Sequence, residues 1–190
     1  MVERVKKGLL IILSGPSGVG KGTVREELFK DESLNLAYSI SMTTRKPRPA
    51  EREGIDYFFV EESEFEDKIN KGELLEYAKF VGNYYGTPQF YVEQLLSEGK
   101  NVVLEIEVQG ALQVMAKRPE ALTIFLVPPS FEELERRIRG RRTEAEEVVR
   151  ERLNKASKEI ATKDEYKYVV VNDDVLIAKE KIAQIILENI

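Results

Sequence analysis

The sequence contains no cysteine and no histidine, and these two absences exclude several kinds of active site. Without cysteine the chain has no disulfide, no thiolate nucleophile and no zinc–thiolate site. Without histidine it has no Ser-His-Asp triad and no histidine-bound metal. Any catalysis must therefore use lysine, arginine, carboxylates and bound metal.

Long apolar runs are absent as well. The run at 9–13 is too short for the core of a signal peptide or for a membrane span, so we expect a cytoplasmic protein. The net charge of −5, from 29 basic and 34 acidic residues, gives no general attraction to nucleic acid or to an anionic membrane. The 190 residues, 42% of them hydrophobic, suit one domain with a real core and room for insertions.

The most informative segment is a glycine-rich turn that follows an apolar run. Residues 9–14 read LLIILS, and residues 15–23 read GPSGVGKGT before a segment compatible with a helix. In such a loop consecutive backbone N–H groups converge on phosphate oxygens, while the lysine reaches the β- and γ-phosphates. A chance match of spaced glycines is the alternative. The pattern predicts that a nucleoside triphosphate is bound by Gly15, Pro16, Ser17, Gly18, Val19, Gly20, Lys21, Gly22 and Thr23.

Gly22 stands where this kind of loop usually offers a serine or threonine hydroxyl to Mg²⁺. Thr23 follows directly, but it lies about 100° further around the start of the helix. We therefore expect Mg²⁺ to enter with the nucleoside triphosphate and to have no direct protein ligand. Thr23, Glu105 and Glu107 are the alternative ligands.

Short β-runs alternate with amphipathic helices, which predicts an α/β fold with a parallel sheet flanked by helices around the phosphate loop. The expected core strands cover 9–14, 101–107, 122–127 and 166–171. The expected helices cover 22–29, 108–116, 131–139 and 174–188. The core is thus assigned to 1–34, 94–129 and 162–190.

Residues 35–93 do not follow this alternation and predict a small mixed α/β insert. They contain β-like pieces at 37–42, 57–60, 74–80 and 83–86, and a short helix with a capping-box pair, Ser63 and Glu66. Residues 130–161 predict a pair of helices, of which the first is the helix at 131–139, with capping boxes at Ser130/Glu133 and Thr143/Glu146. Because an arginine-rich turn joins them, we expect this helical pair to act as a closing lid.

The insert carries a second chemical signal. Arg45 and Arg48, three apart in a proline-stiffened segment, are suited to hold one phosphate, although a solvated basic loop is the alternative. Glu76 follows on a predicted strand. The alternative to a binding role for Glu76 is a solvent-facing position on its strand. The alternative for Tyr57 and Tyr85 is that they are half-buried strand aromatics. Thr87 before Pro88 is equally suited to be the N-cap of the next helix.

With these elements in order, the chain resembles the guanylate kinase family over nearly its whole length. Nine co-linear blocks carry the resemblance: GPSGVGKG, SMTTRKPRP, GIDYFF, GELLEYAKF, GNYYGTP, LEIEVQGA, FLVPPS, RRIRGRRTEAEE and VVNDD. The resemblance implies phosphoryl transfer from Mg-ATP to GMP, and to dGMP, giving ADP and GDP. It implies no nucleic acid, membrane or obligate protein partner.

The resemblance also assigns roles to residues that match the family's motifs. The GMP-binding set in the insert and beside it is Ser41, Arg45, Arg48, Tyr57, Glu76, Tyr85, Thr87 and Glu107. On the other side, Arg137, Arg141 and Arg152 clamp the phosphates of ATP, and Asn172 lies near its adenine. The catalytic set is Lys21, Arg45, Arg137, Arg141 and Arg152. The chain departs from the family at Glu107, where aspartate is usual, and at Arg142, where glycine is usual.

Guanine chemistry supports the role given to Glu76. The base presents N1–H and N2–H donors in a row, so one ionised carboxylate accepts both, whereas adenine has an acceptor at N1. Three rival functions remain open from the sequence: a kinase for another nucleoside monophosphate, a non-enzymatic guanylate-kinase-like binding module, and a nucleic-acid-associated ATPase. The Gly22-Thr23 pair looks like the loop of adenylate kinases, whereas Glu76 with Ser41 favours guanine.

Overall fold

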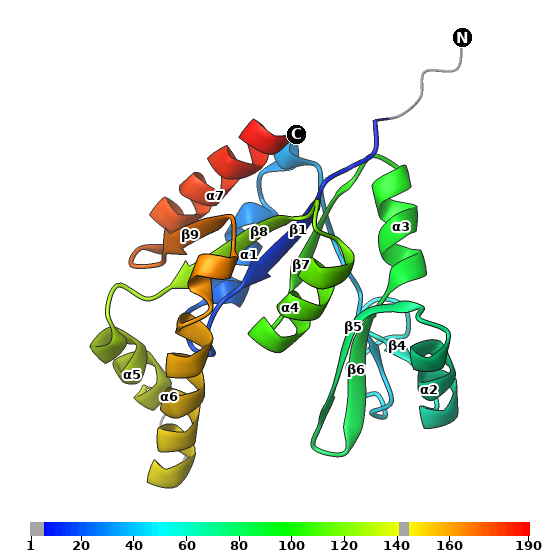
Figure 1. Cartoon of the computed structure of the whole chain (residues 1–190), viewed down its shortest axis with the longest axis horizontal. Coiled ribbons are helices and arrows are strands. Elements are labelled where there is room, and N and C mark those ends of the chain that lie inside the picture. Colours follow the sequence, from blue (N-terminus) through cyan, green and yellow to red (C-terminus); the bar gives the residue numbers. More distant parts are fainter. Residues whose placement is uncertain (1–5, 141–144) are drawn as a thin grey trace.

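Strands β2, β7, β1, β8 and β9 form, in that order, the central parallel sheet of the computed structural model, which describes residues 6–140 and 145–190 (Figure 1). They are β2 (Leu36–Tyr38), β7 (Asn101–Glu105), β1 (Leu10–Ser14), β8 (Leu122–Val127) and β9 (Tyr168–Val171). The predicted α/β fold with a parallel sheet is confirmed. Strands β7 and β9 are shorter than predicted. The first ends at Glu105 rather than at residue 107, and the second begins at Tyr168 rather than at residue 166.

Helices cover both faces of this sheet. Helices α1 (Lys21–Leu28) and α7 (Val175–Asn189) pack on one face, and α3 (Gln89–Ser97) and α4 (Val108–Lys117) on the other. Side chains alternate between the faces of a strand, so Ile11 and Leu13 of β1 join the first group, and Leu10 and Ile12 the second. This double burial explains the continuous apolar run before the phosphate loop.

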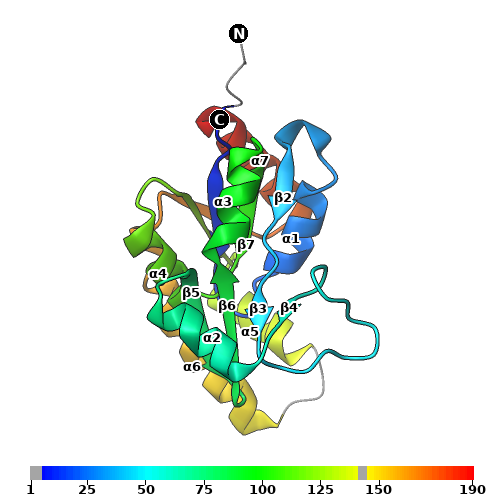
Figure 2. The same cartoon turned by 90° about the vertical axis from the view of Figure 1, so that its right-hand side faces the viewer.

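A second, smaller sheet forms most of the predicted insert. Its order is β4 (Phe58–Phe59), β3 (Met42–Thr43), β6 (Asn83–Pro88) and β5 (Leu74–Phe80), with β5 and β6 antiparallel. Helix α2 (Glu62–Asn70) covers it through the buried Phe65. Figure 2 shows α3 following β6 and leading back to the central sheet.

The central sheet extends further into the sequence than residue 34, where the prediction ended the first core segment. Strand β2 pairs with β7, and Val92 of α3 lies in the core beneath the sheet. The side chain of Asn101 helps to fix this edge, since its amide donates to the Leu34 carbonyl at 2.8 Å and its oxygen accepts from the Leu9 N–H at 2.9 Å. The division into core, insert and lid otherwise stays a prediction.

Helices α5 (Phe131–Arg139) and α6 (Glu146–Ile160) pack together through Leu134, Ile138, Val149 and Ala156. Figure 1 shows this pair and the insert at the same end of the central sheet, on opposite sides. Short 3-10 turns occur at Glu32–Leu34 and Lys163–Glu165. Among the described residues, no helix has the length and apolar content needed to cross a membrane.

The helix caps follow the sequence only in part. Ser130 caps α5 as predicted, since its hydroxyl accepts from the Glu133 N–H at 3.1 Å. The Ser63 prediction is wrong, because α2 begins at Glu62 and its N-cap, Glu61, makes no side-chain cap bond. Helix α6 has Ala145 as N-cap, and Thr143 lies outside the described residues.

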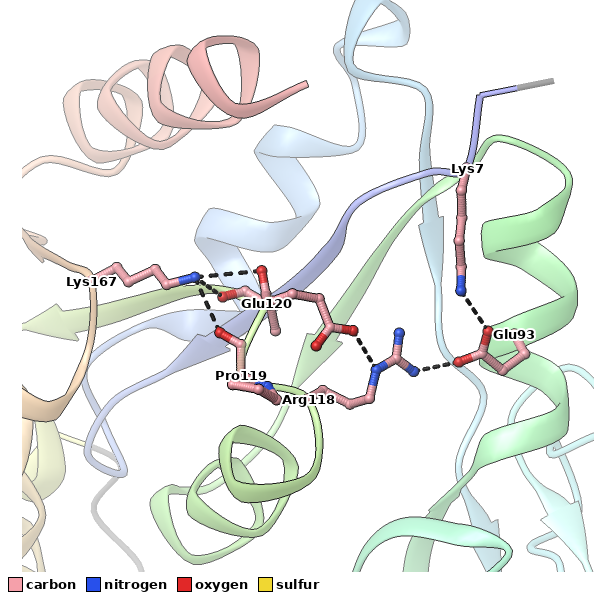
Figure 3. Close-up of polar contacts among 7 residues, drawn as sticks. Lys7, Glu93, Arg118, Pro119, Glu120 and Lys167 are labelled. Atoms are coloured by element: carbon pink, nitrogen blue, oxygen red, sulfur yellow. Dashed lines mark hydrogen bonds and ion pairs between the residues drawn. The ribbon is translucent and has the colours of Figure 1, made fainter. Parts of the chain in front are cut away.

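Arg118 joins three parts of the core in a charged network (Figure 3). Its guanidinium contacts Glu93 of α3 and donates to Glu120 at 2.6 Å, and Lys7 donates to the same Glu93 at 2.9 Å. Beside it, Lys167 donates to the Ala121 carbonyl at 2.8 Å. The network therefore connects the N-terminal segment, α3 and the turn between α4 and β8.

We expect Arg118→Ala to lower the free energy of unfolding by about 1–2 kcal/mol, because it removes a mostly buried side chain together with its bonds to Glu120 and Glu93, of which Glu93 keeps its bond from Lys7. Urea denaturation measures the change. Lys71→Ala, which removes an exposed pair with Asp67 on α2, is the control and should change stability by less than about 0.5 kcal/mol. Equal losses in the two variants would contradict a special role for the network.

Candidate active site

The phosphate loop leaves β1 at Ser14 and enters α1 at Lys21. Gly20 has a φ of 97°, and a Cβ there would lie 2.7 Å from the amide nitrogen of Asn172. A Cβ on Gly15 would lie 2.5 Å from the Leu126 carbonyl oxygen. Only glycine fits both positions, which explains the spacing seen in the sequence.

Lys21 lies folded over its own loop. Its Nζ donates to the carbonyl oxygens of Gly15 at 2.7 Å and of Pro16 at 3.2 Å. Burial lowers the pKa of Lys21, and the nearby carboxylate of Glu105 opposes this effect. The ammonium group is thus held at the loop, at the position from which it can meet a bound phosphate.

Asn172 connects the end of β9 to the loop and is buried. Its side-chain amide donates to the Val19 carbonyl at 2.8 Å, and its backbone carbonyl accepts from Arg137 at 2.9 Å. Arg137 also donates to Glu133 at 2.8 Å, one turn earlier on α5. A cavity of about 590 Å³ opens here, lined by Val19, Gly20, Thr23, Glu133, Arg136, Arg137, Asn172, Asp173 and Val175.

The second helix of the predicted lid also reaches the loop. Arg152 donates to the Ser17 hydroxyl at 2.9 Å. Lys155 donates to Glu107 at 2.7 Å, and Glu159, whose pKa is raised by burial, lies 3.7 Å from the Lys155 ammonium. The sequence reasoning missed Lys155 and Glu159, although their spacing from Arg152 places all three on one helix face. Arg141 lies outside the described residues, as does Arg142.

A second cavity, of about 360 Å³, lies between the insert and the carboxyl end of β7. Its lining is Ser41, Tyr57, Glu76, Ala78, Phe80, Tyr85, Gly86, Glu105, Ile106, Glu107, Gln109 and Gly110. Five residues of the predicted GMP-binding set are therefore brought together, namely Ser41, Tyr57, Glu76, Tyr85 and Glu107. Glu105 lines this cavity and also lies beside the phosphate loop, since a Cβ built on Gly22 would be 3.6 Å from its Oε1.

Arg45 lies beside this cavity. Its guanidinium is 5.5 Å from the ring centre of Tyr57 and donates to Glu51 at 2.8 Å. Glu51, which the sequence reasoning missed, also accepts from the backbone N–H of Arg48 at 2.8 Å. The side chain of Arg48 is exposed and is not part of the cavity lining. Glu51 thus holds the arginine segment while Arg45 faces the tyrosines.

Glu76 lines the cavity and forms a buried pair with Thr87. The Thr87 hydroxyl donates to Glu76 Oε1 at 2.6 Å. Burial raises the pKa of Glu76, whereas the bond from Thr87 and the charge of Lys117 lower it. Two of the open alternatives are therefore wrong: Glu76 is not solvent-facing, and Pro88 rather than Thr87 is the N-cap of α3.

Acidic side chains near the loop are dispersed. Glu105 forms an ion pair with Arg25 at 2.7 Å, and Glu107 is paired with Lys155. Among the described residues, no cluster of three or more acidic side chains is placed to hold a metal ion. Thr23 is exposed and lines the cavity near Asn172.

Comparison with known proteins decides the family, since the guanylate kinase family model matches residues 7–189. The chain belongs to the guanylate kinase family. It is 59% identical to a guanylate kinase of Bacillus cereus over 184 residues, which cover 97% of this chain and 90% of the relative. It is 57% identical to that of Lactococcus lactis over 181 residues, or 95% and 88% of the two chains. The crystal structure of guanylate kinase from Anaplasma phagocytophilum is similar to it with a TM-score of 0.72 and 35% identity, covering 96% of this chain and 86% of the other.

Proposed function

We propose that this member of the guanylate kinase family transfers the γ-phosphoryl group of Mg-ATP to GMP, and to dGMP, giving ADP and GDP. The observation that carries the proposal is the buried Glu76–Thr87 pair in a cavity that adjoins the phosphate loop at Glu105. A carboxylate accepts the N1–H and N2–H of guanine, and hydroxyl groups donate to O6. An adenylate kinase would gain nothing from a buried carboxylate opposite N1 of adenine.

The residue roles that we propose follow the two cavities. The loop amides and Lys21 hold the β- and γ-phosphates of ATP, and Asn172 and Arg137 border the side where its adenine binds. Arg45, Arg48, Tyr57 and Tyr85 hold the phosphate of GMP, while Ser41, Glu76 and Thr87 read its base. Arg137, Arg141 and Arg152 stabilise the migrating phosphoryl group. Catalysis then consists of alignment and charge neutralisation, because the phosphate oxygen of GMP is itself the nucleophile.

Mg²⁺ bound with ATP neutralises charge on the phosphates. The residues present suit an ion that they contact through water. A Cβ built on Gly22 would lie 3.6 Å from Glu105 Oε1, so the Glu105 carboxylate faces the position where this kind of loop usually has its hydroxyl ligand. Glu107, held by Lys155, is the further carboxylate on this side. We propose that both act through water rather than as direct ligands.

We propose that the insert at 35–93 and the helical pair at 130–161 close over the two substrates. Closure would exclude water from the phosphoryl transfer. The contacts of Arg152 with Ser17 and of Lys155 with Glu107 support a lid that reaches both cavities. We propose a cytoplasmic enzyme that needs no nucleic acid, membrane or obligate protein partner, consistent with its small-molecule substrates. A coupled assay of ADP formation with GMP, dGMP, AMP and UMP tests the proposed function.

We expect Thr23→Val to change kcat by less than about threefold, because Thr23 faces the cavity near Asn172 and not Glu105. The measurement is kcat as a function of Mg²⁺ concentration. Gly22→Ser is the matched variant: its hydroxyl would approach Glu105, and we expect it to be tolerated and to lower the Mg²⁺ concentration required. A hundredfold loss of kcat in a folded Thr23→Val protein would identify Thr23 as a direct ligand.

A further inference from the structure

Helix α4 is fixed to strand β5 along one face. The Lys117 ammonium donates to the Leu74 carbonyl at 2.7 Å. One turn earlier, the Gln113 amide donates to the Tyr77 carbonyl at 2.9 Å and its oxygen accepts from the Tyr77 N–H at 3.2 Å. Because residues three and four apart share a helix face, the next position toward the N-terminus on this face is Gly110.

Gly110 is buried directly against the Glu76 carboxylate. A Cβ at position 110 would lie 2.7 Å from Glu76 Oε2, 3.2 Å from its Cδ and 3.4 Å from its Cγ. The first of these distances is well below any normal contact of carbon with oxygen. The Glu76 carboxylate therefore occupies space that is free only because residue 110 has no side chain.

The two sides of this contact are held with different strength. Glu76 Oε1 accepts from Thr87 at 2.6 Å, and the two residues are paired between β5 and β6. The bonds of Gln113 and Lys117 hold the helix at its distance from β5. A side chain at position 110 would thus displace the carboxylate rather than the helix.

We propose that Gly110 is a specificity-determining position, which sets where the Glu76 carboxylate meets the edge of the guanine base. The inference rests on the proposed function, since it concerns how the same cavity selects guanine. Gly110 acts through Glu76 and is in this sense a positioning residue. The core helix α4, and not the insert alone, then determines the choice of base.

The test is Gly110→Ala, assayed with GMP, with inosine monophosphate and with ATP as the varied substrate. We expect KM for GMP to rise at least tenfold and KM for ATP to stay within twofold. Inosine monophosphate lacks the 2-amino group, so a displaced carboxylate loses more with GMP. The preference for GMP over inosine monophosphate should therefore fall at least fivefold, a change that simple destabilisation does not produce.

Gly72→Ala is the matched control, because it makes the same chemical change, in the insert that carries Glu76, with the opposite expectation. Gly72 has a φ of 68°, and a Cβ there meets no atom within 4 Å. This variant should lose thermal stability through backbone strain but keep both KM values and the base preference. An unchanged KM and preference in folded Gly110→Ala, or the same changes in Gly72→Ala, would overturn the inference.

A double variant keeps the inference testable if Gly110→Ala folds poorly. Glu76→Asp withdraws the carboxylate from position 110, so adding Gly110→Ala to it should cause little further loss in kcat/KM for GMP. A further tenfold loss in the double variant would overturn the inference. Failure of the unmodified protein to phosphorylate GMP would instead contradict the proposed function itself, which separates the two failures.

Discussion

Replacing Lys21 with alanine is expected to lower kcat by about a thousandfold while leaving the affinity for GMP within about twofold. The Lys21 ammonium is held over the phosphate loop by the carbonyl groups of Gly15 and Pro16, and Lys21 is absent from the lining of the second cavity. The two effects should therefore separate. A coupled assay measures kcat, and titration calorimetry measures GMP binding.

Lys30→Ala is the control for removing a lysine from the same part of the chain, since Lys30 is exposed and pairs with the neighbouring Glu27. It should retain both activity and GMP affinity. If Lys21→Ala lost GMP affinity together with transfer, the defect would lie in folding. A kcat within tenfold of the unmodified protein would contradict the role proposed for Lys21.

Replacing Glu76 with glutamine should raise KM for GMP by about a hundredfold or more, because an amide offers one acceptor and an unwanted donor to two N–H groups. The unliganded protein should be at least as stable as before. Burial raises the pKa of Glu76, so the folded state binds its proton more readily than the unfolded chain does. At neutral pH the ionised carboxylate is therefore unfavourable for folding, and its removal does not weaken the fold.

Glu73→Gln provides the matched control, three residues away. Glu73 is half exposed and pairs with Lys68 at 3.3 Å, so this variant should keep its KM for GMP. Steady-state kinetics with GMP and AMP, together with urea denaturation, measure both effects. An unchanged GMP-to-AMP preference in Glu76→Gln would contradict the assignment of this carboxylate to guanine.

The core strands were predictable because burial on both faces of the sheet requires a continuous run of apolar residues. Ile11 and Leu13 pack on one side and Leu10 and Ile12 on the other, so β1 reads as an unbroken apolar run. Strand β2 lacks this double burial, since its three residues are only half-buried or exposed at the edge of the sheet. Its membership depends on pairing with β7, which lies more than sixty residues away in sequence.

A local cap signal can be overridden by a partner from another strand. Ser130 caps α5 as its pattern predicts, whereas Thr87 donates its hydroxyl to Glu76 across the β5–β6 pair instead of capping α3. The strand pairing that creates this alternative is not visible in a local pattern. The alternative that Thr87 caps the helix is wrong for that reason.

The candidate site divides in the same way. The resemblance to guanylate kinase motifs gave Ser41, Tyr57, Glu76 and Tyr85, and the structure places them around one cavity. The partners that orient such side chains come from distant segments: Lys155 binds Glu107 from 48 residues away, and Gln113 binds Tyr77 from 36 residues away. Residue type alone does not predict such pairs, because they depend on how three segments pack together.

The central claim is that the protein makes GDP from GMP at the expense of ATP, and product analysis tests it most directly. The purified protein is incubated with Mg-ATP and each of GMP, dGMP, AMP and UMP, and the nucleoside diphosphates are separated and quantified. We expect GMP and dGMP to be converted, with kcat/KM for AMP and UMP lower by about a thousandfold or more. Conversion of AMP at a rate comparable with that of GMP, or ADP formation without any GDP, would contradict the claim.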